Sequence, residues 1–401
     1  MNATMLLHRL KSVLRRLKSV LRHPKEHPRL RRVILASVLL SLPVVLGAAG
    51  EEQAAGRAQA AANRVAELAA GSAQDPTLRE LVGQRFVVAM QGTSPSPALL
   101  ARIQRGEVGG IILFGGNIES RAQLARSVAA MQQAARTSGR PPLLIATDQE
   151  GGKIRRVPWA GPALATSDLG RLSPAHIQRE ARAAGLRLRS AGINVDLAPV
   201  ADVPAAGSFM ALERRTFASD ARRVAAAATA FARGLESARV APALKHFPGI
   251  GRAIRNTDRT AVALPATLAE LTRTDLLPFR KAIAAGAPIV MISNATYPAL
   301  DAKPAPWSPR IQALLRSTLG FEGVTITDSL DGAAASRGRT IESVSSLAAQ
   351  AGIDLLLLTG TEASSGGAYE SVVRAAERGK IPVAGLQRSY ARITALKEAV
   401  G

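Results

Sequence analysis

The chain has 401 residues, of which 47% are hydrophobic and 20% charged, and 52 Lys and Arg against 30 Asp and Glu give it a formal net charge of +22. So much aliphatic material excludes a disordered or collagen-like chain, and the length allows two or three domains or one large α/β barrel. The absence of cysteine excludes a disulfide scaffold, a thiolate zinc site and a cysteine nucleophile. Eight Phe, three Tyr and two Trp are too few for a surface of stacked bases.

Residues 1–32 predict a basic arm. They contain ten Lys or Arg and one Glu, a net charge of +9, and a seven-residue repeat begins at Leu10 and again at Leu17. At helical spacing the repeat places its leucines on one stripe with basic side chains around it. We expect this arm to remain cytoplasmic and to contact an anionic membrane or cell-wall surface. Nucleic-acid binding is the other reading of the charge, but no nucleic-acid-reading fold surrounds the arm.

Residues 33–50 form an uncharged apolar run of 18 residues, which is just long enough to span a bilayer, and the small residues Ala48-Ala49-Gly50 suit a cleavage site. The run therefore predicts a signal-peptide h-region or a transmembrane anchor, and the long basic arm favours the anchor. A buried helix behind a disordered tail is the alternative. Residues 51–77, rich in Ala, predict a solvated spacer. The remaining part, 78–401, is then expected outside the cytoplasm, membrane-anchored or secreted.

Eight short apolar runs alternate with longer amphipathic stretches. The runs are continuously apolar, which is typical of strands buried on both faces of a parallel sheet. They cover residues 86–90, 109–114, 142–148, 193–200, 241–247, 287–293, 323–328 and 354–360. The helical stretches include 120–137, 173–191, 220–239, 267–285 and 308–319. Asp220 and Ser308 are predicted N-caps, and Pro309 occupies a first-turn position.

This alternation predicts one α/β domain over residues 78–401, a (β/α)8 TIM barrel. A doubly wound open sheet is the second possibility, although no G-x-G-x-x-G motif follows the first strand. In a barrel, chemistry gathers at the carboxyl ends of the strands. Polar residues end five successive predicted strands: Asp148, Asp202, Lys245 with His246, Ser293 with Asn294, and Asp328. A candidate active site is therefore expected there.

The residue types at these strand ends suit sugar chemistry. The carboxylate of Asp328 can attack an anomeric carbon or stabilise an oxocarbenium ion, although Asp328 can also be a helix N-cap. Asp148 offers a carboxylate to hydroxyl groups, and the Arg155-Arg156 pair offers guanidinium groups to acetamide or carboxylate oxygens. Lys245 can alternatively form a Schiff base, as in an aldolase. Glu150 lies beyond the strand end on a tight Gly turn, and we expect a structural role for it.

Several longer motifs surround these strand ends. The main motifs are Lys245-His-Phe-Pro-Gly-Ile-Gly, Asp148-Gln-Glu-Gly-Gly-Lys-Ile-Arg-Arg, Gly192-Ile-Asn-Val-Asp-Leu-Ala-Pro-Val-Ala-Asp-Val and Gly323-Val-Thr-Ile-Thr-Asp-Ser-Leu. Shorter ones are Gly109-Gly-Ile-Ile-Leu-Phe, Arg215-Thr-Phe-Ala-Ser-Asp, Tyr297-Pro-Ala-Leu-Asp and Leu319-Gly-Phe-Glu-Gly-Val. With these motifs the chain resembles glycoside hydrolase family 3, and in particular the single-domain bacterial β-N-acetylhexosaminidases of peptidoglycan turnover. The motifs occur in family order between about Leu81 and Leu330, and the resemblance does not extend to residues 1–76.

The resemblance implies a retaining glycosidase that acts on a carbohydrate substrate with no metal or organic cofactor. It assigns the catalytic nucleophile to Asp328. It assigns sugar binding to five further positions, which are Asp148, Arg156, Arg215, Lys245 and His246. We expect a monomer that cleaves terminal β-linked N-acetylhexosamine.

The chain departs from the family in the loop that carries the general acid/base. The family has His-Gly and then Asp-Ser-His in this loop, whereas this chain has Ile250 and then Asn256-Thr257-Asp258. Asp258 thus occupies the position of the acid/base histidine, and it can protonate the leaving oxygen if a dry pocket raises its pKa. The alternative is weak or lost activity, that is, a barrel that binds glycan as a cell-wall protein. Two further departures leave the exact sugar open. Residues 204–212 differ from the family, and Asn294 stands at a position where the family commonly has His.

Overall fold

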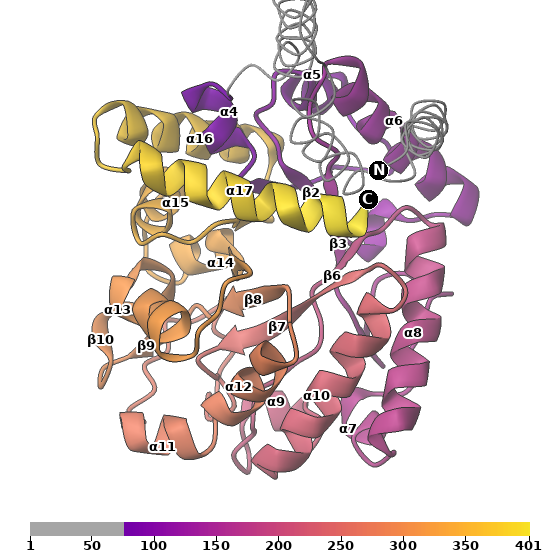
Figure 1. Ribbon diagram of the computed structural model, residues 1–401, viewed down its shortest axis with the longest axis vertical. Helices are drawn as coiled ribbons and strands as arrows, with labels where there is room; N and C mark the ends of the chain where they lie inside the picture. Colours follow the sequence, from indigo (N-terminus) through magenta and orange to yellow (C-terminus); the bar gives the residue numbers. More distant parts are fainter. Residues whose placement is uncertain (1–75) are drawn as a thin grey trace, which may run out of the picture. The chain divides into compact units, whose positions relative to one another are not determined.

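The computed structural model describes residues 76–401, and the basic arm, the apolar run 33–50 and residues 51–75 of the spacer lie outside this range. All eight predicted apolar runs contain a strand of one parallel sheet (Figure 1). The strands are β1 (Phe86–Ala89), β2 (Gly110–Leu113), β3 (Leu144–Thr147), β6 (Val195–Asp196), β7 (Ala241–Phe247), β8 (Ile289–Ile292), β11 (Val324–Thr327) and β12 (Leu356–Leu358). Two antiparallel hairpins extend from loops, β4 (Gln149–Gly151) with β5 (Ile154–Arg155) and β9 (Thr296–Tyr297) with β10 (Asp301–Pro304).

The sheet curls into a nearly closed barrel, as the sequence predicted, and is not an open sheet. Neighbouring strands pair in chain order from β1 to β11, and β12 pairs with β1. Between the two remaining edges, a parallel bridge joins Ile326 to Leu355. The backbone N–H of Leu355 donates to the carbonyl of Thr325 at 2.8 Å, and that of Thr327 donates to the carbonyl of Leu355 at 3.0 Å.

Helices follow the strands and cover the outside of the barrel (Figure 1). The longer ones are α5 (Pro97–Gln104), α6 (Arg121–Thr137), α8 (Pro174–Ser190), α10 (Ala221–Glu236), α12 (Leu276–Ala284), α15 (Ile341–Gln350), α16 (Glu362–Glu377) and α17 (Val383–Val400). Shorter ones are α4 (Leu78–Gly83), α7 (Thr166–Leu169), α9 (Phe209–Leu212), α11 (Leu268–Arg273), α13 (Pro309–Ala313) and α14 (Leu330–Ala335). Within residues 76–401, no helix combines the length and the apolar character that a membrane span requires.

Two predicted helices are interrupted. The stretch 267–285 divides into α11 and α12, because Pro278 lacks a backbone N–H and fits only the first turn of a helix, so a new helix begins at Leu276. The stretch 308–319 divides into α13 and a wide π-type turn, Leu314–Thr318. Both predicted N-caps are confirmed. The Asp220 side chain accepts from the N–H of Arg223, and that of Ser308 accepts from the N–H of Ile311.

The inside of the barrel is apolar, and α17 closes its amino-terminal end. Inward-facing side chains of the strands form one buried cluster, which three residues of α17 join. The strand residues include Val87, Ile112, Leu144, Ile289 and Ile326, and those of α17 are Ile393, Leu396 and Val400. This closed end leaves the carboxyl ends of the strands as the place for chemistry.

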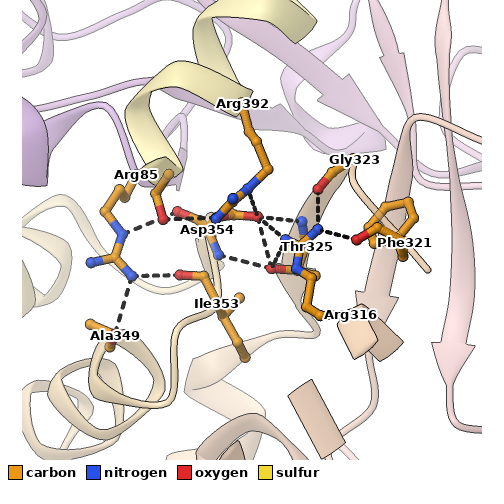
Figure 2. A network of polar contacts seen from close by, with 10 residues as sticks. Arg85, Arg316, Phe321, Gly323, Thr325, Ala349, Ile353, Asp354 and Arg392 are labelled. Atoms are coloured by element: carbon orange, nitrogen blue, oxygen red, sulfur yellow. Dashed lines mark hydrogen bonds and ion pairs between the residues drawn. The ribbon is translucent and has the colours of Figure 1, made fainter. Parts of the chain in front are cut away.

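A buried carboxylate, Asp354, fastens the closed end (Figure 2). Asp354 is fully buried before β12 and forms ion pairs with Arg316 and with Arg392 of α17. Its Oδ2 also accepts from the backbone N–H of Thr325 at 2.9 Å. Burial alone raises the pKa of Asp354, but the hydrogen bonds and charges of Arg392 and Arg316 outweigh it and hold the pKa below its ordinary value. The network ties β11, β12 and α17 together.

Candidate functional site

The predicted polar residues gather at the carboxyl ends of the strands. Asp148 directly follows β3, Asp328 directly follows β11, and Lys245 and His246 lie near the end of β7. The pairing of β7 with β8 shifts between Leu244 and Phe247. In a regular strand, neighbouring side chains point to opposite faces of the sheet. Here the strand is irregular, and Lys245 and His246 both contact carboxylates at the barrel mouth.

Lys245 lies at the centre of an ion-pair cluster. Its Nζ is 2.7 Å from Oδ1 of Asp148 and 2.7 Å from Oε1 of Glu150. Glu150 in turn accepts two hydrogen bonds from Arg215, from Nε at 2.9 Å and from Nη2 at 2.8 Å. Such a bidentate contact fixes the guanidinium plane. The cluster therefore joins the hairpin after β3, the loop before α10 and strand β7.

Lys245 and Glu150 stay ionised in this cluster. Burial alone lowers the pKa of Lys245, but the charges of Asp148 and Glu150 outweigh it, so the pKa lies above its ordinary value. Burial raises the pKa of Glu150, and the charges of Arg215 and Lys245 outweigh it and bring the pKa well below the ordinary value. A protonated, doubly paired lysine is a poor amine nucleophile, which argues against the Schiff-base alternative.

His246 is oriented by the buried carboxylate of Asp202, which lies in the loop after β6. Its Nδ1 is 2.8 Å from Oδ2 of Asp202, which is fully buried. The other oxygen of Asp202 accepts from the backbone N–H groups of His246 at 3.3 Å and of Ile250 at 2.8 Å. With Nδ1 donating to Asp202, Nε2 is the nitrogen left to face a ligand. Asp202 therefore fixes both the imidazole and the start of the loop after β7.

Asp328 has a carboxylate that is nearly buried, with 9% of the residue exposed. Its Oδ1 accepts from the backbone N–H of Ser329 at 2.8 Å, and its own N–H donates to the carbonyl of Ile292 at 2.9 Å. The N-cap of α14 is Ser329, whose hydroxyl accepts from the N–H of Gly332. The alternative that Asp328 serves as the helix N-cap is therefore wrong.

Asp258 is held in the loop after β7 by neighbours on both sides. Its backbone N–H donates to the side chain of Asn256 at 2.8 Å, and its Oδ1 accepts from Nδ2 of Asn294 at 3.0 Å. The loop passes so close to α14 that a Cβ on Gly332 would lie 2.9 Å from Cβ of Asp258. The missing side chain of Gly332 thus makes room for Asp258 beside the segment that begins with Asp328.

The environment of Asp258 favours its protonated form. Burial, and next the negative charge of Asp328, raise the pKa of Asp258 to about 7, against the opposing effects of His246, Asn294 and Arg215. Asn294 links Asp258 to the segment of Asp328, because its Nδ2 donates to Oδ1 of Asp258 at 3.0 Å and to the carbonyl of Ser329 at 2.9 Å. A buried carboxyl group whose raised pKa favours the protonated form is suited to the role of general acid.

Arg156 is the predicted site residue with the weakest connection to the others. Its backbone N–H donates to the carbonyl of Asp148 at 3.3 Å, so it lies beside the β4–β5 hairpin. Its Nε is buried and has no hydrogen-bond partner within residues 76–401. Arg156 can therefore offer donors to a ligand next to Asp148.

Two further carboxylates, Glu150 and Asp196, lie among the site residues and were not predicted to belong there. Glu150 pairs with both Lys245 and Arg215, so it belongs to the site and does more than end a turn. Asp196, at the end of β6, is also fully buried, and burial raises its pKa to about 8. The position of Asp196 at the end of a strand, like that of Asp202, was the signal that could have revealed it. Within the described part of the chain, no group of His, Cys, Asp or Glu residues could hold a metal ion.

Comparison with known proteins identifies a family. The family model described as the glycosyl hydrolase family 3 N terminal domain matches residues 77–396. An uncharacterized secreted glycosyl hydrolase of Arthroderma benhamiae is 35% identical over 324 residues, which are 79% of this chain and 92% of that protein. A beta-hexosaminidase of Stenotrophomonas maltophilia is 34% identical over 282 residues, 68% of this chain and 82% of that protein.

A solved structure agrees with this identification. The glycoside hydrolase family 3 beta-N-acetylglucosaminidase of a Paenibacillus species superimposes with a TM-score of 0.77 at 33% sequence identity. The match covers 81% of this chain and 62% of the Paenibacillus chain, so this chain spans about three fifths of that protein.

Proposed function

Because the chain is a glycosidase that belongs to glycosyl hydrolase family 3, we propose that it removes terminal β-linked N-acetylhexosamine from cell-wall glycans by a retaining mechanism. The observation that carries the proposal is the position of Asp258 beside the segment that begins with Asp328, where it is hydrogen-bonded by Asn294 and packs on Gly332. Burial raises the pKa of Asp258 to about 7, which suits a proton donor. The beta-hexosaminidase relative and the beta-N-acetylglucosaminidase structure support the choice of sugar.

In the first step, a carboxylate oxygen of Asp328 attacks the anomeric carbon while Asp258 protonates the glycosidic oxygen. The bond between the anomeric carbon and this oxygen breaks, and the leaving group departs as an alcohol. The proton comes from Oδ2 of Asp258, because Oδ1 already accepts from Asn294. The product of this step is a glycosyl ester of Asp328 and an ionised Asp258.

In the second step, Asp258 is the base. Esterification removes the negative charge of Asp328, which is one cause of the raised pKa of Asp258. The pKa of Asp258 therefore falls when the intermediate forms, so it stays ionised and can accept a proton from water. The water oxygen attacks the anomeric carbon and releases Asp328.

The ion-pair cluster is assigned to sugar binding. Lys245 has three donors and uses two of them on Asp148 and Glu150, which leaves one for a sugar hydroxyl. Oδ2 of Asp148 accepts no hydrogen bond within residues 76–401 and is left for a second hydroxyl. Arg156, Arg215 and His246 are assigned to the remaining oxygens. Rigid mutual pairing supports this role, since preorganised groups bind with little loss of conformational entropy.

The test is a panel of aryl glycosides offered to the full chain. We expect hydrolysis of an aryl N-acetyl-β-glucosaminide well above that of the matching glucoside and xyloside. Asp328→Asn should abolish turnover, and a fluorinated glycoside should label Asp328 alone. Sugar binding without turnover of any member of the panel would contradict the proposal and would favour a glycan-binding cell-wall protein.

We further propose that the domain works outside the cytoplasm, membrane-anchored or secreted. The basic arm and the apolar run 33–50 support export, as does the secreted relative. Cell fractionation tests this: the full chain should be recovered with membranes or in the medium. Recovery in the cytoplasmic fraction would overturn the export proposal and leave the glycosidase unaffected.

A further inference from the structure

A cavity of about 390 Å³ lies beside the outer helices α6 and α8. Its lining comes from the hairpin and loop after β3, from the first turn of α6 and from α8. Its polar lining consists of Arg121, Arg155, Arg187 and Glu180, and Trp159 and Pro158 contribute apolar surface. Arg155, which adjoins the assigned site residue Arg156, lines it, whereas the residues assigned above to catalysis and sugar binding do not.

Three guanidinium groups line this cavity without carboxylate partners. Within residues 76–401, Arg121, Arg155 and Arg187 form no ion pair. In the same range, their side chains make one hydrogen bond, a long contact of Arg187 with the carbonyl of Ala160 at 3.4 Å. Several arginines elsewhere in the domain, such as Arg215 and Arg392, do have carboxylate partners. Guanidinium groups without a carboxylate partner can donate to carboxylate or phosphate oxygens.

The rest of the lining fits a sugar better than a bare anion. The indole of Trp159 is half-buried and carries the Arg121 guanidinium over one face, 5.4 Å from the ring centroid, so a sugar ring would pack on the opposite face or edge. The carboxylate of Glu180 is in weak contact with His176 at 3.6 Å, so its oxygens can accept from hydroxyl groups. The volume is within the range of about 300–1,000 Å³ typical of ligand pockets.

Hydrogen bonds hold the loop that lines the cavity in one conformation. Gln149 is fully buried, and its side chain donates to the carbonyls of Val157 at 2.9 Å and Gly161 at 2.7 Å. Its Oε1 accepts from the N–H of Val157 at 2.9 Å. These three bonds fasten the loop that carries Trp159 to the hairpin, and a fixed loop lowers the entropic cost of binding.

We propose that this cavity is a second carbohydrate site, which binds an acidic oligosaccharide through its carboxylate groups. The three arginines pair with carboxylates of the chain, and Trp159 packs against a sugar ring. The strongly positive charge of the protein draws such a polyanion toward it. Binding here holds the glycosidase on an acidic polymer and raises the effective concentration of nearby chain ends at the barrel mouth.

The test uses tetragalacturonate as the probe and the full chain as the protein, with affinity measured by titration calorimetry at low and physiological salt. Arg121→Ala and Arg187→Ala should each weaken binding at least tenfold. Arg179→Ala, an exposed arginine of α8 outside the cavity, is the matched control and should change affinity less than twofold. The probe should also alter tryptophan fluorescence, and Trp159→Phe should remove that signal, because the only other tryptophan, Trp307, is buried.

Asp328→Asn should bind the probe as the unchanged chain does, so a failure of the glycosidase proposal is distinguishable from a failure here. Four results would overturn the second site. They are no binding, equal loss in Arg179→Ala, displacement of the probe by N-acetylglucosamine, and sulfate binding as tight as that of tetragalacturonate. The third would mean that the probe occupies the barrel mouth, and the fourth would mean a plain anion site. Circular dichroism melts of each variant check that it is folded.

Discussion

The side-chain amide of Asn294 donates a hydrogen bond of 3.0 Å to Oδ1 of Asp258, and its second amide hydrogen is used by the carbonyl of Ser329 at 2.9 Å. The backbone carbonyl of Asn294 accepts from Nη2 of Arg337 at 2.6 Å. Both donor hydrogens of this buried amide are thus committed, so its orientation is fixed. Asn294 thereby leaves Oδ2 as the oxygen of Asp258 that carries the proton.

Asn294→Ala should change the pH dependence of the enzyme. The hydrogen bond from Asn294 lowers the pKa of Asp258, so its loss should raise that pKa further. A general acid acts in its protonated form, and activity on poor leaving groups therefore falls as pH rises through the pKa. We expect the alkaline limb of the kcat/KM profile to move to higher pH, and the rate to fall about 10- to 100-fold because the carboxyl is less well oriented. An unmoved limb would show that Asn294 does not act on the titrating acid.

Asp258→Ala should separate natural glycans from activated substrates. Loss of a general acid should slow cleavage of an unactivated β-N-acetylglucosaminide by about 10²–10⁴-fold. The rate at which the glycosyl-enzyme forms from an aryl glycoside with a good leaving group should change little. Added azide should restore the breakdown of the glycosyl-enzyme, because an anionic nucleophile needs no base. Glu377→Ala, at an exposed carboxyl on the last residue of α16, is the control and should leave both reactions unchanged.

If Asp258→Ala has no effect on either substrate, Asp258 is not the acid. The double variant Asn256→Asp with Asp258→His, which restores the family pair, then becomes informative. A gain on natural glycans would show that the remaining site is competent.

Gly332→Ala should disturb Asp258 without removing any polar group. The new Cβ would lie 2.9 Å from Cβ of Asp258 and 3.0 Å from its Cα, closer than carbon atoms pack, so the loop must move. We expect activity on unactivated glycans to fall by about 10- to 100-fold, with a smaller loss on activated aryl glycosides. Gly366→Ala is the matched control, since Gly366 is also helical and has nothing within 4 Å of the added atom. Equal losses in both variants would contradict this steric account.

The sequence predicted the barrel because its strands are short, apolar and regularly spaced. It also predicted the five polar strand ends, because each apolar run is followed by a polar residue. It did not predict that Glu150 would face Lys245 and Arg215, because the hairpin that turns it toward them is set by β4 and β5 pairing. The breaks in the helices at 267–285 and 308–319 depend on local backbone geometry, which hydrophobic periodicity does not report. The partnership of Asn294 with Asp258 joins positions 36 residues apart and needs the three-dimensional fold.

Asp354→Asn should destabilise the closed end of the barrel. The neutral side chain would leave the charges of Arg316 and Arg392 without their common partner, a change that typically costs about 3–5 kcal/mol at a buried site. Because the folded-state pKa of Asp354 is lowered, its stabilisation is present above the pKa of about 4 of an unfolded aspartate and is lost as pH falls through the lower folded value. In urea unfolding, the free energy of unfolding of Asp354→Asn should therefore lie far below that of the unchanged chain at pH 7 and pH 5. The difference should be smaller near pH 3. Glu370→Gln removes the exposed ion pair with Arg79 and should cost less than about 1 kcal/mol. A cost for Asp354→Asn no larger than this control would mean that the arginines find other partners and that the network in Figure 2 does not stabilise the barrel.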